Sequence, residues 1–214
     1  MLITRRPTMF LGDQHDLPEP DAEMATDLLS RAPSAGSWDR PPYPDETADA
    51  FFARLIDEGR LGDAVLLAAV SLGPRRAVWW GSLCVWDHIK RLKLKVEGLE
   101  SAAVDAAVEW VLCPDDEKRL EAKAIADKAG GEKPWGALAM APFWAGGSIA
   151  PADCPAVSPP AGLAEKIVAN AVLKAAADPD PPTRQGRLMQ SLRLAAEVQT
   201  GMTSFAAAAG GEPQ

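Results

Sequence analysis

Residues 77–90 read AVWWGSLCVWDHIK and place three tryptophans, one cysteine and one histidine in fourteen positions. At the 100° per residue of an α-helix, the indole rings and aliphatic side chains cover almost the whole circumference, and only Asp87 and Lys90 are charged. A helix that is apolar on nearly all sides is enclosed by its neighbours. The stretch therefore predicts the central helix of a helical domain. We expect the structural core to include Trp79, Trp80, Leu83, Cys84, Trp86 and Trp110.

The composition of the 214-residue chain also favours helices. Alanine and leucine are abundant while valine, isoleucine and threonine are sparse, which favours helix over strand. A chain of this length, with 47% hydrophobic residues, can bury a sizeable core. We therefore predict an all-α fold, a single globular bundle of about seven to eight helices with an extended N-terminal arm.

Proline, glycine and charge patterns divide the chain into three parts. Residues 1–44 are predicted to form an acidic, proline-rich arm, partly ordered, with one short helix over about 21–31. Residues 45–205 are predicted to be the helical domain, and residues 206–214 a flexible tail. The helices of the domain are expected at about 47–60, 63–72, 74–90, 101–112, 114–130, 134–144, 163–177 and 183–200, with a loop over 146–162.

Charge and hydropathy exclude several classes of partner. The net charge of −8 argues against sequence-independent binding of nucleic acid, which needs a broadly basic surface. The sequence has no run approaching the roughly 18 apolar residues of a membrane span. Three cysteines cannot all pair within one chain, and reduced thiols are usual inside cells. We expect a cytoplasmic protein that binds neither nucleic acid nor membrane.

The arrangement in the sequence that most suggests a catalyst consists of the three cysteines and one histidine. Cys84 and His88 are four residues apart, and Cys113 and Cys154 could complete a Cys₃His zinc site; the first two could also form a nucleophilic pair. A CxxC pair is absent, however, and a buried helix offers no obvious substrate access. We therefore expect no catalytic residue, no metal and no cofactor. An enzyme or zinc protein that uses these four residues remains the alternative.

Two stretches have the composition of a protein-binding surface. Between Lys133 and Glu165 the only charged residue is Asp153. The nearly uncharged loop in this stretch is either packed under the domain or offered to a partner. The run KRLKLK at 90–95 is either the solvated end of a helix or a docking patch for an acidic partner. The residues expected to bind a partner protein are Phe143, Trp144, Gly146, Gly147, Ser148 and Ile149, with the cations Lys90, Arg91, Lys93 and Lys95 nearby.

Three motifs together resemble a known family. They are AVWW-x₃-C at 77–84, W-x₃-P-x₄-R at 110–119 and FW-x-GGS-x-AP at 143–151, and the resemblance covers roughly residues 60–200. The sequence resembles a family of uncharacterised proteobacterial all-helical proteins, a domain of unknown function associated with type VI secretion loci. Ala145 stands where the resemblance leads us to expect serine.

The resemblance implies no activity, and it favours an adaptor or chaperone-like accessory protein. It implies that the partner is another protein, either a secreted effector or a secretion component. Together with the residues discussed above, it leads us to expect a non-enzymatic helical protein-interaction module. The oligomeric state is not predicted by any feature of the sequence.

Overall fold

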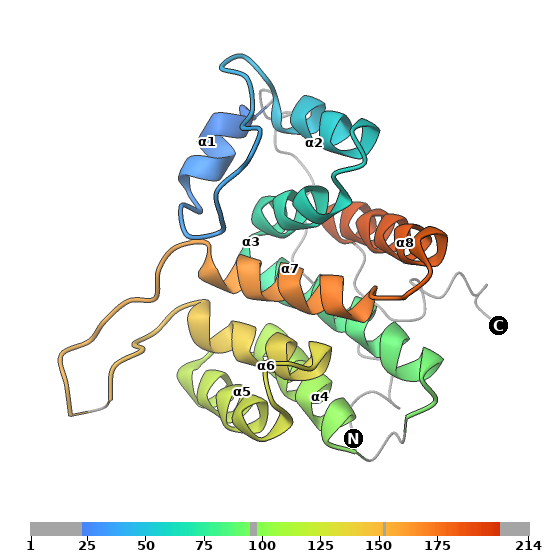
Figure 1. Cartoon of the computed structure of the whole chain (residues 1–214). Helices are drawn as coiled ribbons and strands as arrows, with labels where there is room; N and C mark the ends of the chain where they lie inside the picture. The colour runs from blue at the N-terminus through green and yellow to red at the C-terminus, as the bar shows by residue number, and fades with distance from the viewer. Residues whose placement is uncertain (1–22, 95–97, 152, 202–214) are drawn as a thin grey trace.

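The computed structural model describes residues 23–94, 98–151 and 153–201, and every regular element in this part of the chain is an α-helix (Figure 1). The all-α prediction is confirmed. Among these residues, none of the helices combines the length and the apolar character that a bilayer crossing requires. The helices are α1 (Ala25–Ser30), α2 (Ala48–Asp57), α3 (Leu61–Arg91), α4 (Leu99–Leu112), α5 (Asp116–Ala129), α6 (Pro134–Trp144), α7 (Leu163–Ala175) and α8 (Pro181–Gln199).

Helix α3 is the centre of the bundle. It packs against α1, α2, α4, α6, α7 and α8, whereas α5 lies at one side against α4 and α6 (Figure 1). A Cβ atom on Gly81 would lie 2.9 Å from carbons of both Leu138 and Val168, so this glycine lets α6 and α7 approach α3 closely. Of the residues expected in the core, Trp79, Trp80, Leu83, Cys84 and Trp110 are buried, and Trp86 is partly buried.

The break that the sequence predicts between two helices at Gly73–Pro74 is present in the structure, as a non-helical residue inside α3. Gly73 has φ 69° and ψ 170°, a left-handed conformation that favours glycine, and the helix resumes at once with Pro74. Proline suits the first turn of the resumed segment because it has no N–H group to leave unpaired. The break is therefore a kink of a single residue within α3.

Capping residues set the helix ends that the sequence predicts imperfectly. Helix α5 begins at Asp116 instead of at Pro114, because the Asp115 carboxylate accepts the N–H of Lys118 at 2.8 Å and so occupies the N-cap position. Asp180 caps α8 in the same way, accepting the N–H of Thr183 at 3.1 Å. In both cases the short acidic side chain just before the helix accepts an N–H group of the first turn, and this fixes where the helix begins.

Residues 23–44, the described part of the predicted N-terminal arm, lie against the helical body. The N–H of Ala25 donates to the carbonyl of Glu46 at 2.9 Å, and the Trp38 and Phe51 rings meet edge to face at 5.5 Å. Further along, the N–H of Ser34 donates to the carbonyl of Ala161 at 3.0 Å, which joins this segment to the beginning of α7. The rest of the predicted arm, 1–22, and the predicted tail, 206–214, lie outside the described residues.

Candidate functional site

Arg119 on α5 is buried, and its guanidinium joins α5 to the GGS segment, residues 143–151. It donates to the carbonyl oxygens of Phe143 at 3.3 Å and of Ser148 at 3.1 Å, and to the Asp116 carboxylate at 2.8 Å. Its central carbon also lies 5.1 Å from the centre of the Phe143 ring. A planar group with five donors suits this divergent set of acceptors. One side chain therefore fixes the GGS segment relative to α5.

Gly147 and Ser148 shape the GGS segment from within. Gly147 has φ 68°, and a Cβ atom there would lie 2.7 Å from the Arg119 Nε atom, so only glycine fits against the guanidinium. The Ser148 hydroxyl accepts the N–H groups of Ala150 and Val157, both at 3.2 Å. These bonds close the base of the projecting loop, residues 145–151 and 153–162, which extends away from the helices in Figure 1.

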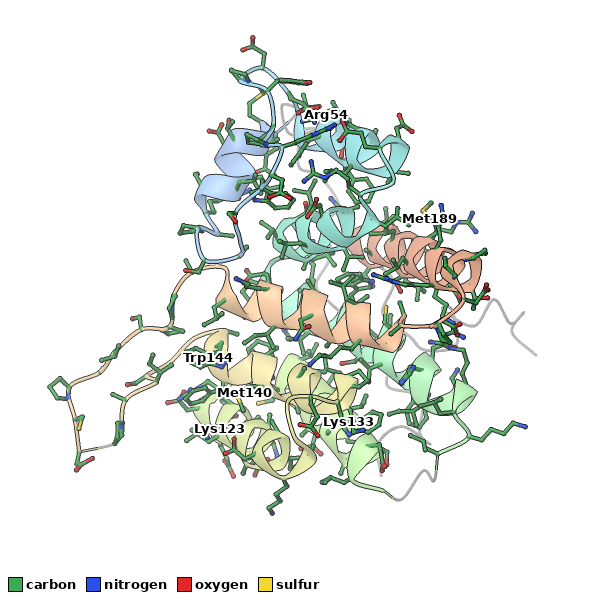
Figure 2. All side chains as sticks on the ribbon, viewed as in Figure 1. Arg54, Lys123, Lys133, Met140, Trp144 and Met189 are labelled. Atoms are coloured by element: carbon green, nitrogen blue, oxygen red, sulfur yellow. The ribbon has the colours of Figure 1, made fainter. Side chains whose placement is uncertain are left out.

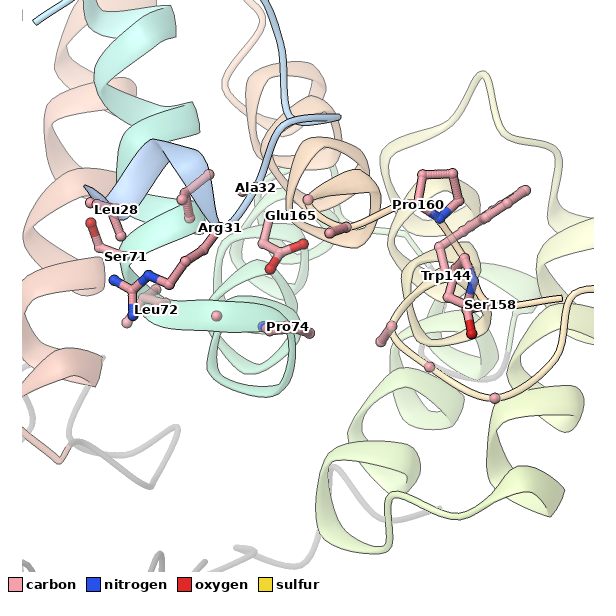
Figure 3. A pocket seen from close by; sticks show the side chains of 18 residues that line it. Leu28, Arg31, Ala32, Ser71, Leu72, Pro74, Trp144, Ser158, Pro160 and Glu165 are labelled. Atoms are coloured by element: carbon pink, nitrogen blue, oxygen red, sulfur yellow. The ribbon is translucent and has the colours of Figure 1, made fainter. Parts of the chain in front are cut away.

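A cavity of about 660 Å³, the Glu165 cavity, lies at the base of the projecting loop (Figure 3). Its walls come from α1, from the kink of α3, from both ends of the projecting loop and from the first turn of α7. The lining residues are Leu28, Arg31, Ala32, Val70, Ser71, Leu72, Gly73, Pro74, Trp144, Ala145, Gly146, Gly147, Ser158, Pro159, Pro160, Ala161, Gly162 and Glu165. A cavity of this size is in the range of ligand-binding pockets.

Glu165 is the buried charge of this cavity, with a residue exposure of only 7%. Its carboxylate accepts its own backbone N–H in the first turn of α7 and has no ion-pair partner among the described residues. Burial raises the pKa of Glu165, and the backbone hydrogen bond opposes that rise. A second cavity, about 860 Å³ between α1, α2, α3 and α8, has no buried ionisable side chain in its lining. The Glu165 cavity is therefore the candidate site.

Replacing Glu165 by glutamine stabilises the protein at neutral pH but not in acid. The folded-state pKa lies above the ordinary value of 4.5, so the folded state binds the proton more tightly than the unfolded state does. Wild-type stability therefore falls as the pH rises from about 4.5 through the raised pKa, and the variant lacks this loss. We expect a difference near zero at low pH that grows to about 1 kcal/mol at neutral pH. Urea unfolding over this pH range measures it; a difference independent of pH contradicts the assignment.

The structure places the predicted binding residues at two distant positions. Trp144 lies at the end of α6, beside the projecting loop (Figure 2), and its ring meets the Phe143 ring edge to face at 5.4 Å. Phe143 is buried, Gly147 is exposed, and the remaining residues of this group, Gly146, Ser148 and Ile149, are partly buried. The structure thus brings the aromatic and glycine residues of the prediction together in one segment.

The predicted cations are not near that segment. Lys90, Arg91 and Lys93 are exposed at the end of α3, and Arg91 donates to the carbonyl of Ala175 at 3.1 Å. Ala175 is the last residue of α7, whereas the projecting loop leads into its first residue, so the two groups are separated by the helix length of about 18 Å. The expectation that these cations lie beside the GGS segment is wrong. Lys95 lies outside the described residues.

The structure also separates the residues of the predicted zinc site. Cys84 is buried beside α8, while Cys113 and Cys154 are exposed, at the end of α4 and in the projecting loop. Within the described residues, groups of three or more histidine, cysteine or acidic side chains suited to a metal ion are absent. Burial raises the pKa of the Cys84 thiol to about 12, and burial lowers the pKa of His88. Burial thus favours the neutral thiol and the neutral imidazole, and it opposes the thiolate–imidazolium ion pair of an activated cysteine.

Two residues of the site were missed by sequence reasoning. Arg119 belongs to the second quoted motif, but nothing in the sequence indicates that it reaches the third. Glu165 has the position of an ordinary acid in the first turn of a helix. Just before Glu165 the chain approaches the segment that follows α1, and an added Cβ atom on Gly162 would lie 2.8 Å from the Ala32 backbone. A long-range contact of this kind leaves no local signal.

Comparison with known proteins identifies a family. The model of a family of unknown function, DUF6931, matches residues 51–199, which is well over half of the chain and includes all three motifs and Glu165. No curated protein and no solved structure matches the chain. The matched range leaves out α1 and so one wall of the Glu165 cavity. The chain belongs to DUF6931, a family of unknown function.

Proposed function

We propose that this protein is a non-enzymatic helical interaction module, and that the Glu165 cavity with Trp144 is where it binds its partner protein. The observation that carries this proposal is the Trp144 indole beside a cavity at the base of a loop that Arg119 holds in place. Tryptophan in a partly enclosed position is a frequent energetic centre of protein interfaces. A binding residue on a rigid loop also loses less conformational entropy when the partner binds.

The lining of the cavity favours recognition over chemistry. Among the described residues that form it, only Arg31 and Glu165 are charged, and Arg31 forms an ion pair with Glu23. The other walls are backbone, proline, alanine, leucine, valine, serine and one indole ring. Such a set offers shape, hydrogen bonds and one uncompensated charge, which are the components of a binding pocket.

An adaptor or chaperone-like role in type VI secretion is the finer form of this proposal. It is supported by the resemblance of the three motifs to an uncharacterised family associated with such loci. Two of these motifs meet at the site, since Arg119 belongs to one and its two carbonyl acceptors belong to the other. In this role the partner is a secreted effector or a component of the secretion apparatus.

Replacing Trp144 by aspartate is expected to abolish capture of the partner without unfolding the protein. The substitution removes an indole from the wall of the cavity and adds a charge, and loss of a tryptophan at an interface centre typically costs about 2 kcal/mol or more, a thirtyfold loss of affinity. The measurement is affinity purification of the tagged full chain from its native cell, with thermal unfolding as the check on folding.

The matched control is Leu120→Asp, because Leu120 is an exposed apolar residue on α5, away from the cavity. The control variant should retain the partner. A folded Trp144→Asp variant that keeps its partner, or loss of the partner in both variants, would count against the Glu165 cavity as the binding site.

A further inference from the structure

We propose that the Glu165 cavity receives a positively charged side chain, arginine or lysine, from the partner protein. This inference rests on the proposed function and specifies the chemistry of the partner. Three features of the cavity support it: a buried carboxylate that no described residue pairs with as a counter-ion, the carbonyl end of a helical segment, and an indole ring. Each of them interacts favourably with a cation.

The first feature is the isolation of the Glu165 charge. Only 7% of the residue is exposed, and within the described parts of the chain the donor to its carboxylate is its own backbone N–H alone. The other charged residue of the lining, Arg31, is already paired with Glu23, and in Figure 3 its guanidinium points toward Ser71 and Leu72. A buried carboxylate without a counter-ion costs stability, and a cation from outside removes that cost.

The second feature is the kink of α3, where residues 70–74 line the cavity. The non-helical backbone at Gly73 ends the first helical segment, and Pro74 has no N–H group to donate to the Val70 carbonyl. The last carbonyl groups of a helix carry partial negative charge and accept hydrogen bonds from cations. The Glu165 carboxylate and the carbonyl end of this helical segment therefore both present negative charge to the same cavity.

The third feature is the indole of Trp144. Figure 3 shows Trp144 across the cavity from Glu165, on the side of the projecting loop, and both residues line the same cavity. A cation over an indole face gains roughly 0.5–2 kcal/mol, with arginine the more frequent partner. The volume of about 660 Å³ accommodates a long basic side chain together with part of the segment that carries it.

The test is an NMR titration of the full chain with N-acetyl-arginine amide, and with N-acetyl-citrulline amide as the uncharged analogue of the same shape. We expect the arginine probe to shift the Trp144 indole N–H and the Glu165 amide signals, and the citrulline probe to leave them in place. Glu165→Gln should weaken binding of the arginine probe about tenfold or more, because a charge-assisted hydrogen bond is lost. Glu197→Gln, at an exposed acid on α8, is the matched control and should bind as the wild type does.

Equal shifts with both probes, no shift with either, or unchanged binding in Glu165→Gln would overturn the inference. Capture of the natural partner separates this failure from that of the proposed function. If Trp144→Asp loses the partner while Glu165→Gln keeps it, the interaction module stands and the cationic side chain is wrong. If both variants lose the partner and the control Glu197→Gln keeps it, both proposals are supported.

Discussion

Replacing Arg119 by methionine lowers the free energy of unfolding by about 3 kcal/mol, because it leaves two carbonyl groups of the GGS segment without a donor. Methionine fills most of the space that the arginine stem occupies, so the loss reports chiefly on the hydrogen bonds to Phe143 and Ser148. Chemical unfolding followed by circular dichroism measures the change. We also expect faster hydrogen exchange in residues 143–149, since their attachment to α5 is removed.

Two further variants identify which contact of Arg119 matters. Asp116→Asn removes the ion pair alone, and because the Asp116 side chain is 71% exposed, this variant should cost less than about 1 kcal/mol. Arg119→Lys keeps the charge but loses the planar donor set, so it should recover only part of the stability. If Asp116→Asn were as damaging as Arg119→Met, the guanidinium would act through the ion pair, and the GGS segment would be held by other contacts.

Replacing Trp80 by alanine is the second large effect, a loss of about 4 kcal/mol in the free energy of unfolding. Trp80 is fully buried, and its indole N–H donates to the carbonyl of Ser191 on α8 at 2.7 Å. The substitution therefore creates a cavity between α3 and α8 and leaves a buried carbonyl unpaired. Equilibrium unfolding in urea gives the value directly.

The same substitution at Trp86 is the natural comparison, because this residue lies on the same helix but is only partly buried. It should cost less than half as much, since part of the ring is already in contact with water. Trp80→Phe should fall between the two, with burial mostly retained and the hydrogen bond lost. Equal losses at positions 80 and 86 would contradict the assignment of Trp80 as the more deeply buried of the two rings.

The central helix could be predicted from the sequence because its pattern is local. Residues 77–90 are apolar around nearly the whole helix, and no arrangement on a surface would bury them. Gly73 and Pro74 signalled the interruption that the structure shows as a kink. The exact first residues of α5 and α8 were harder to predict. Asp115 follows a proline and Asp180 precedes one, and proline also suits the start of a helix.

The site could be predicted only in part because its members come from distant segments. The composition of the GGS segment predicts a binding surface, and Trp144 of this segment does line the Glu165 cavity. The sequence predicts the cationic run at 90–95 near the same surface, but the length of α7 separates this run from the GGS segment, and a sequence gives no measure of that distance. Glu165 becomes distinctive only when α1, the kink of α3 and the projecting loop surround it.

The central claim is that the tryptophan-rich α3 is a scaffold and that binding takes place at the Glu165 cavity. Hydrogen exchange of the full chain, alone and with its captured partner, tests this most directly. The account predicts that residues 77–89 exchange slowest in both states, and that the partner newly protects residues 144–149 and 162–166. New protection confined to the Cys84 and His88 end of α3, with the cavity unchanged, would contradict it.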